Sequence, residues 1–514
     1  MTSPEANDLA GALPRFAQRA DRYLADSREP GAPVVEYLPP AALQAALKFP
    51  LGGPRTPEDL ERAVEQVLRY SVRTGHPRFF NQLYGGADPA GILGDWLATL
   101  INTSMYTYEV APVGTVVELA LIEHLNRFVG FPEGEGILTA GGSLSNLMAL
   151  LAARHRAWPQ AKRHGLPSGI RPVLFISAEA HYSTSRAAAV AGLGADAAIS
   201  IPTDAVGRMI PEELERAVVG ARSEGKAPFL VVATSGTTVA GAFDPIGAIG
   251  DIAERNGLWL HVDASYGGGV LLSDRYRHLM AGVARADSVA WNPHKMMGLP
   301  LTCSVILTRR KGVLEATNGM QADYLFHGAD GGTPDLGDRS LQCGRRVDAF
   351  KLWFSWLANG DQGYARRVER LFELAGIFRQ LLDQREGFHL VREPEGTNVC
   401  FRYLPPAARG LKGEERRRRE HQLTLAVRSE LSRSGRFMLN YAPVDGVATF
   451  RMVLSNPATS PDDLLALLGA IEDAAAPVRP RAGPEPSPSP RPAESIRHTP
   501  VRPLTPHGLE RHCG

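Results

Sequence analysis

Lys295 ends the sequence Asn292-Pro293-His294-Lys295, a short distance after an apolar run that closes with His261-Val262-Asp263-Ala264. Its amine could condense with the aldehyde of a cofactor. A carboxylate leaving a buried strand could keep a pyridine nitrogen protonated, so that the ring accepts electrons. Alone, such a lysine is usually a solvated loop residue and such an aspartate a turn or cap residue. The pair in this order predicts a pyridoxal 5'-phosphate site.

A small, polar turn could hold the phosphate of such a cofactor. The sequence Gly141-Gly142-Ser143-Leu144-Ser145-Asn146 stands between an apolar run and an apolar-striped segment that reaches about Trp158. Small residues let backbone N–H groups approach an anion, and the N-terminus of a helix adds its positive end. The alternative is a turn that only joins a strand to a helix.

Two more polar segments follow apolar runs. His181 could stack on a planar ring or transfer a proton, and the alternative is a structural histidine. Thr238 and Asp244 are compatible with ligand contact and also with ordinary turn and cap positions.

Short runs rich in Val, Ile, Leu and Ala alternate with helical patterns along the chain. These runs cover residues 136–140, 173–177, 229–234, 258–262, 288–291 and 304–308. The alternation predicts an α/β unit with a mainly parallel sheet that is buried on both faces. Ligands of such sheets bind beyond the carboxyl ends of the strands, and the polar motifs directly follow the runs.

We expect four segments along the chain. They are an N-terminal helical arm (1–60), a large cofactor-binding domain (61–345), a linking helix with a small C-terminal domain (346–476), and a tail (477–514). The tail is rich in Pro, Ser and Arg, and it cannot bury enough apolar surface to offset its ordering entropy. We therefore expect it to be disordered.

The composition argues against several classes of partner. The 514 residues carry 56 Lys plus Arg against 55 Asp plus Glu, which gives no global attraction for nucleic acid or anionic lipid. No stretch reaches about 18 consecutive apolar residues, so we expect no membrane association. The four cysteines are far apart and lack metal-ligand spacing. They predict free thiols, no metal site and a cytoplasmic location.

Taken together, these segments resemble the group II pyridoxal-phosphate-dependent amino-acid decarboxylases, and within them the glutamate and cysteine-sulfinate decarboxylase branch. Besides the motifs above, the resemblance rests on residues 76–83, 106–112, 342–348 and 450–457. It implies the α/β, PLP-dependent transferase-like fold (fold type I). That fold has a mainly parallel, seven-stranded large domain, a smaller C-terminal α/β domain and an N-terminal helical arm.

The resemblance also implies roles for individual residues. Lys295 matches the lysine that binds the cofactor aldehyde, Asp263 the partner of the pyridine nitrogen, and His181 the histidine that stacks on the ring. The other matches to cofactor contacts are Ser143, the backbone around Leu144, Ser145, Thr238, Asn292 and His294. Gln82 and Arg451 fall where the family contacts the substrate carboxylate, which a guanidinium can grip in a bidentate way.

The reaction implied is α-decarboxylation of an amino acid to an amine and CO2. Tyr324 matches the tyrosine of the family's mobile catalytic loop and is the expected proton donor to Cα. The glycines around it, Gly319, Gly328, Gly331 and Gly332, favour a segment that can close over the site. The resemblance further implies a homodimer with the active site at the subunit interface.

Arg451 and Gln82 favour an acidic substrate over an aromatic one, because a buried guanidinium needs an anionic partner. Tyr84 and Tyr106 stand where the glutamate enzymes have smaller or less polar residues. This resembles the cysteine-sulfinate and aspartate decarboxylases and implies a substrate one methylene shorter than glutamate. The alternatives are another PLP-dependent reaction, such as transamination on the same fold, and a non-catalytic protein that docks partners through its Pro-rich tail.

Overall fold

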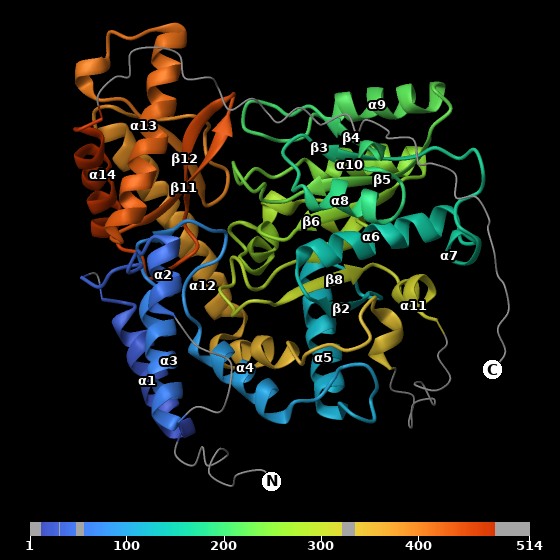
Figure 1. Ribbon diagram of the computed structural model, residues 1–514. Coiled ribbons are helices and arrows are strands. Elements are labelled where there is room, and N and C mark those ends of the chain that lie inside the picture. The colour runs from blue at the N-terminus through green and yellow to red at the C-terminus, as the bar shows by residue number, and fades with distance from the viewer. Residues whose placement is uncertain (1–11, 30, 48–55, 321–334, 479–514) are drawn as a thin grey trace, which may run out of the picture. The chain divides into compact units, whose positions relative to one another are not determined.

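The computed structural model describes residues 12–29, 31–47, 56–320 and 335–478, which form helices and two β-sheets (Figure 1). The helices are α1 (Ala12–Asp26), α2 (Pro40–Ala46), α3 (Pro57–Tyr70), α4 (Pro89–Ile101), α5 (Pro112–Val129), α6 (Gly142–Ala157), α7 (Ala161–His164), α8 (Ser183–Val190), α9 (Pro211–Ser223), α10 (Ile246–Asn256), α11 (Val313–Asn318), α12 (Ala349–Gln384), α13 (Gly413–Ser434) and α14 (Pro461–Ala475). None of these helices is long and apolar enough to cross a membrane, as far as the described residues go.

The larger sheet has seven strands in the order β2-β8-β7-β6-β5-β3-β4. Their bounds are β2 (Glu135–Thr139), β3 (Pro172–Ser177), β4 (Ala198–Ile201), β5 (Ala227–Thr234), β6 (Trp259–Ala264), β7 (Ser288–Trp291) and β8 (Ser304–Thr308). Neighbours from β4 to β7 are parallel, whereas β8 runs antiparallel to both β7 and β2. The predicted mainly parallel, seven-stranded sheet is thus confirmed.

The apolar runs predict most of these strands closely, because strands covered on both faces are nearly continuous in Val, Ile, Leu and Ala. All six residues of the central strand β6 are buried. The edge strand β4 gave no such run, since three of its four residues are only partly buried or exposed and it includes Ser200.

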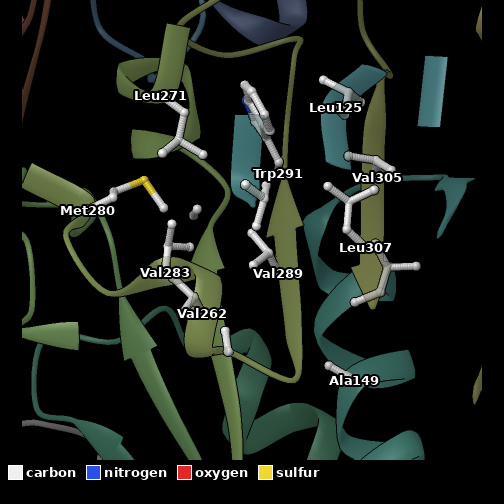
Figure 2. Packing of buried hydrophobic residues seen from close by; sticks show 14 of the residues in the cluster. Leu125, Ala149, Val262, Leu271, Met280, Val283, Val289, Trp291, Val305 and Leu307 are labelled. Carbon is white, nitrogen blue, oxygen red and sulfur yellow. The ribbon is translucent and has the colours of Figure 1, made fainter. Parts of the chain in front are cut away.

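Helix α6 packs against β5, β6, β7 and β8, so one helix covers the centre of the sheet. Part of the main hydrophobic core appears in Figure 2, where Val289 and Trp291 of β7 stand beside Val305 and Leu307 of β8. The packing of this core holds the central strands in place, and the polar motifs follow the carboxyl ends of these strands.

The second sheet has the order β1-β11-β12-β10-β9 and a separate hydrophobic core, to which α13 and α14 contribute. Its strands are β1 (Phe79–Phe80), β9 (Phe388–Leu390), β10 (Asn398–Tyr403), β11 (Met438–Val444) and β12 (Val447–Val453). The four C-terminal strands pair antiparallel, whereas β1 arrives from far upstream and pairs parallel with β11.

A buried ion pair joins α5 to the chain before α12. One guanidinium nitrogen of Arg345 lies 3.1 Å from a carboxylate oxygen of Glu118, and that oxygen also accepts the Leu138 backbone N–H at 2.8 Å. Side-chain exposure is only 4% for Arg345 and 1% for Glu118. Both charges are thus buried, and removal of one leaves the other without its counter-charge.

We therefore expect Glu118→Ala to lower the free energy of unfolding by about 3–5 kcal/mol, because it leaves a buried guanidinium without its anion. Urea unfolding followed by circular dichroism measures this change. The control is Glu123→Ala on the exposed face of the same helix, which should change stability by no more than about 0.5 kcal/mol. Equal effects of the two substitutions would contradict the importance of the buried pair.

Candidate active site

A cavity of about 230 Å³ lies at the carboxyl ends of the central strands. The segments that follow β2, β3, β5, β6 and β7 all contribute to its wall. The lining residues are Leu83, Gly141, Gly142, Ser143, Asn146, His181, Ser183, Thr234, Gly236, Thr238, Asp263, Ser265, Tyr266, Asn292, His294, Lys295 and Thr302. The cavity thus gathers most of the residues that the sequence singled out, from segments up to about 150 positions apart.

Asp263 lies in β6, between Thr234 of β5 and Ala290 of β7. One carboxylate oxygen accepts Asn146 Nδ2 at 2.8 Å, and the other accepts the backbone N–H of Ser265 at 3.1 Å. Burial by itself raises the pKa of a carboxyl group. Here the bond from Ser265 and the positive charge of Lys295 outweigh burial and hold the pKa of Asp263 below its usual range. A buried carboxylate anion therefore lines the cavity.

Lys295 lies in the turn after β7, where its backbone N–H donates to the Asn292 carbonyl at 2.9 Å. Desolvation lowers the pKa of its amine, and the carboxylate of Asp263 opposes part of that shift. The amine consequently loses its proton at a lower pH than an ordinary lysine does, and the neutral amine is the form that attacks an aldehyde.

His181 follows β3 and is held by Ser183, whose Oγ lies 2.8 Å from His181 Nδ1. Burial lowers the pKa of this imidazole. Asp263 acts in the opposite direction, and Lys295 lowers the pKa further. The ring is therefore neutral near pH 7, and it lines the same cavity as the amine and the carboxylate.

The start of α6 can receive an anion. The helix begins after Gly141, whose φ of 120° suits glycine, and no side chain caps this end within the described part of the chain. A Cβ on Gly142 would lie 2.6 Å from Ser265 Oγ and 2.7 Å from Asn292 Nδ2, so only glycine fits there. Ser143 lines the cavity at this N-terminal end of the helix, where the helix dipole favours an anion.

Asn292 and His294 complete this end of the cavity. The buried Oδ1 of Asn292 has no hydrogen-bond partner among the described residues, so a polar ligand can form a hydrogen bond with this amide. Burial, with the nearby charge of Lys295, lowers the pKa of His294 to about 4. Its Nδ1 lies 2.8 Å from the Cys303 carbonyl oxygen and 3.1 Å from the Cys303 backbone nitrogen, so the backbone of Cys303 holds the ring in place at the cavity wall.

Two residues of the expected phosphate-binding set, Leu144 and Ser145, do not line the cavity. Ser145 is fully buried, with its Oγ 2.7 Å from Thr139 Oγ1 and within hydrogen-bond distance of the Val305 carbonyl. Its hydroxyl thus joins α6 to β2 and β8.

Arg451 and Gln82, expected to contact the substrate, also lie outside the lining. Arg451, in β12, reaches its edge by donating to the carbonyl of Thr238 at 3.2 Å and to that of Asn81 at 2.9 Å. Arg451 is 7% exposed, it has no carboxylate partner in the part of the chain that the structure describes, and its buried Nε has no hydrogen-bond partner there.

The remaining predicted residues fall elsewhere. Tyr84 packs near Phe79, with ring centroids 6.0 Å apart, and neither Tyr84 nor Tyr106 lines the cavity. Tyr324 lies outside the described residues, as do Gly328, Gly331 and Gly332.

Some lining residues were missed at the level of sequence. Asn146 was noted only as part of the Gly-Gly-Ser turn, and Ser183 and Ser265 carried no assignment although each follows a predicted site residue by two positions. Proximity to a motif was their only signal. Tyr266 is a further case; burial raises the pKa of its phenol to about 12, and its hydroxyl bonds Thr397.

This arrangement fits pyridoxal phosphate group by group. A lysine amine with a lowered pKa can take an aldehyde, a carboxylate anion can face a pyridinium nitrogen, and a neutral imidazole can lie on a ring. The uncapped start of α6, with Ser143, Asn292 and His294, can hold a phosphate. The cofactor chemistry read from the sequence therefore has a matching cavity.

Comparisons with known proteins agree with this chemistry. Residues 44–404 match the family model of the pyridoxal-dependent decarboxylase conserved domain. Over 446 residues the chain is 45% identical to cysteine sulfinic acid decarboxylase from Mus musculus, covering 85% of this chain and 90% of that protein. It is 44% identical over 445 residues to acidic amino acid decarboxylase GADL1 from Bos taurus, covering 85% of each.

A solved structure supports the same assignment. The crystal structure of mouse CSAD matches with a TM-score of 0.89 and 41% identity, covering 92% of this chain and 100% of that one. The predicted fold type I and the predicted cofactor are thereby confirmed. With a family match over most of its length and relatives this similar, the chain belongs to the pyridoxal-dependent decarboxylase family, whose members are pyridoxal-phosphate enzymes.

Proposed function

We propose that this enzyme removes the α-carboxylate of a small acidic L-amino acid, namely cysteine sulfinate, aspartate or glutamate, and releases the amine and CO2. One observation carries the proposal: Lys295, Asp263 and His181 line a single cavity at the end of a parallel sheet. The relatives named cysteine sulfinic acid decarboxylase and acidic amino acid decarboxylase support this substrate class.

The cofactor, when bound, supplies a ring that accepts the electron pair left behind by CO2. Asp263 keeps a proton on the pyridine nitrogen, since its own pKa is low and its position in β6 is fixed. The amine of Lys295 would hold the cofactor aldehyde, and His181 would pack on the ring. Ser143, Asn292 and His294, with the N–H groups near Leu144, hold the phosphate. Ser145 supports this set by fixing α6 to the sheet.

Arg451 supports an anionic substrate side chain. It is buried, it donates only to backbone carbonyls, and it has no carboxylate partner within the described residues. A buried guanidinium is stabilised most by an anion that accepts two hydrogen bonds from it. Because Arg451 bonds the carbonyl of Thr238, which lines the cavity, a side-chain sulfinate or carboxylate can reach it from there. Gln82 is proposed as a second contact.

Purified protein with added pyridoxal phosphate should release CO2 and amine from at least one of L-cysteine sulfinate, L-aspartate and L-glutamate. If the substrate is one methylene shorter than glutamate, kcat/KM for cysteine sulfinate or aspartate should exceed that for glutamate by about 10- to 100-fold. Product analysis distinguishes decarboxylation from transamination, which would yield a keto acid.

The matched variants are Lys295→Ala and Lys311→Ala. The first should abolish turnover, because the aldehyde loses its covalent partner. The second removes an exposed lysine just after β8, which runs antiparallel to β7 and so ends at the opposite edge of the sheet from the cavity, and it should leave turnover unchanged. If the protein binds the cofactor but releases no CO2 from any acidic amino acid, the proposed substrate class is wrong.

We propose Tyr324 as the donor of the proton that returns to Cα, an assignment that rests on the family resemblance alone. Tyr324→Phe keeps the ring and removes the hydroxyl. We expect amine formation to fall by about 100-fold or more, or to give way to abortive transamination, because general acids of this kind contribute roughly that factor. An unchanged rate of amine formation in stopped assays would remove Tyr324 from the mechanism.

We also propose a homodimer. Two helices that pack on α12 expose apolar side chains: Leu93, Trp96 and Leu100 on α4, and Val113 and Val116 on α5. The α4 residues recur at helical spacing, so they form one stripe. Exposed apolar stripes of this kind favour contact with another protein surface.

Sedimentation equilibrium should give twice the mass of the 55.5 kDa chain. Val116→Asp should weaken self-association at least tenfold, because an unpaired charge would be buried at the interface. Val219→Asp on α9 is the control, since Val219 is similarly exposed at 61% against 53% for Val116. A monomeric wild-type protein at micromolar concentration would contradict the proposal.

A further inference from the structure

We propose that Asn146 and His261 are positioning residues that orient both Asp263 and His181 toward the cofactor, through a continuous chain of buried hydrogen bonds. The inference rests on the proposed function, which assigns Asp263 and His181 their roles. Neither Asn146 nor His261 is needed to touch the substrate, and His261 does not line the cavity.

The chain of bonds follows one face of β6. Side chains two positions apart in a strand share a face, so Trp259, His261 and Asp263 all lie on the same side of the sheet. Asn146 of α6 lies between the last two. Its amide contacts Asp263 Oδ2 at 2.8 Å and His261 Nε2 at 3.0 Å. Such a polar stripe is unusual in a strand whose residues are all buried.

Chemistry fixes the direction of each bond. The carboxylate of Asp263 can only accept, so the amide group of Asn146 that faces it must be the NH2 group. The carbonyl oxygen of Asn146 then faces His261 Nε2, which must carry a proton. Burial lowers the pKa of His261 to about 4, so the ring is neutral and its Nδ1 can only accept.

The rest of the chain agrees with that direction. Ser288 Oγ, 2.9 Å from His261 Nδ1, must donate to it. Ser288 Oγ in turn accepts Trp259 Nε1 at 2.8 Å, and an indole N–H can only donate. Donors and acceptors therefore alternate without conflict from Trp259 to Asp263. Reversing the Asn146 amide would place a carbonyl oxygen against a carboxylate.

A second branch reaches His181. The same NH2 group of Asn146 donates to Ser183 Oγ at 3.0 Å, and Ser183 Oγ lies 2.8 Å from His181 Nδ1. The backbone N–H of Ser183 donates to the same His181 Nδ1 at 3.3 Å, so this nitrogen is an acceptor and Ser183 Oγ donates to it. One amide thus sets the carboxylate that meets the pyridine nitrogen and the imidazole that packs on the ring. His261 prevents that amide from rotating.

The test uses two replacements of His261 that differ in which nitrogen they imitate. Glutamine places an N–H close to the position of Nε2 and can still donate to Asn146, whereas asparagine is too short to do so. We expect His261→Asn to weaken pyridoxal phosphate binding by apo protein about tenfold, as for the loss of one buried bond to a polar partner. His261→Gln should stay within about threefold of wild type.

Cofactor binding is measured by absorbance titration of apo protein. The orientation of the bound cofactor is measured by visible circular dichroism, and we expect this spectrum to differ from wild type in His261→Asn but not in His261→Gln. His76 provides the matched control pair. It is fully buried and makes hydrogen bonds through both ring nitrogens, but it does not line the cavity. His76→Gln and His76→Asn should both alter the unfolding temperature, but the two variants should bind the cofactor with equal affinity.

A second variant, Asn146→Leu, keeps the side-chain volume while removing both branches, and it should lose at least tenfold in affinity and change the visible spectrum. Equal affinities for His261→Gln and His261→Asn, or wild-type values for Asn146→Leu, would overturn the inference. The proposed function fails separately, if wild-type protein does not bind the cofactor or if Asp263→Asn binds it as wild type does.

Discussion

The site depends on one carboxylate, that of Asp263, staying ionised although it is buried in the sheet. Asp263 is 5% exposed, and burial alone would favour its neutral form. It stays charged because the Asn146 amide and the Ser265 N–H each donate to it, and because Lys295 lies nearby. The same carboxylate limits how far the pKa of Lys295 falls. The ionisation of carboxylate and amine is therefore coupled, and neither group can be replaced without changing the other.

The parallel strands bring the other functional residues close to this carboxylate. Since β3, β5, β6 and β7 all point the same way, the segments that follow them meet at one edge of the sheet. Helix α6 covers that sheet and brings both its N-terminal N–H groups and Asn146 to the same edge. The anion-binding end and the Asp263 end of the cavity are thus held by one rigid helix.

The sequence predicted the features that depend on local pattern. Buried parallel strands are nearly continuous in apolar residues, so the large sheet and the motifs at its edge could be located in advance. Pairings between distant segments could not be. The two residues of β1 carry no strand pattern, and only their pairing with β11 makes them a strand. Ser145 follows the turn in sequence, but helical geometry directs its side chain into the core.

Arg451 shows why the pocket was harder to predict than the reaction chemistry. It lies in β12 of the second sheet, yet it donates to the carbonyl of Thr238 after β5 and to that of Asn81 next to β1. Arg367 of α12 likewise donates to the carbonyls of Met296, just beyond Lys295, and of Ser455, just beyond β12. Two guanidinium groups therefore connect the edge that carries the chemistry to the second sheet. Under the proposed role of Arg451, substrate choice depends on how the two sheets are held together, which no local pattern encodes. Lys295, Asp263 and His181, in contrast, all lie in or directly after strands of the large sheet.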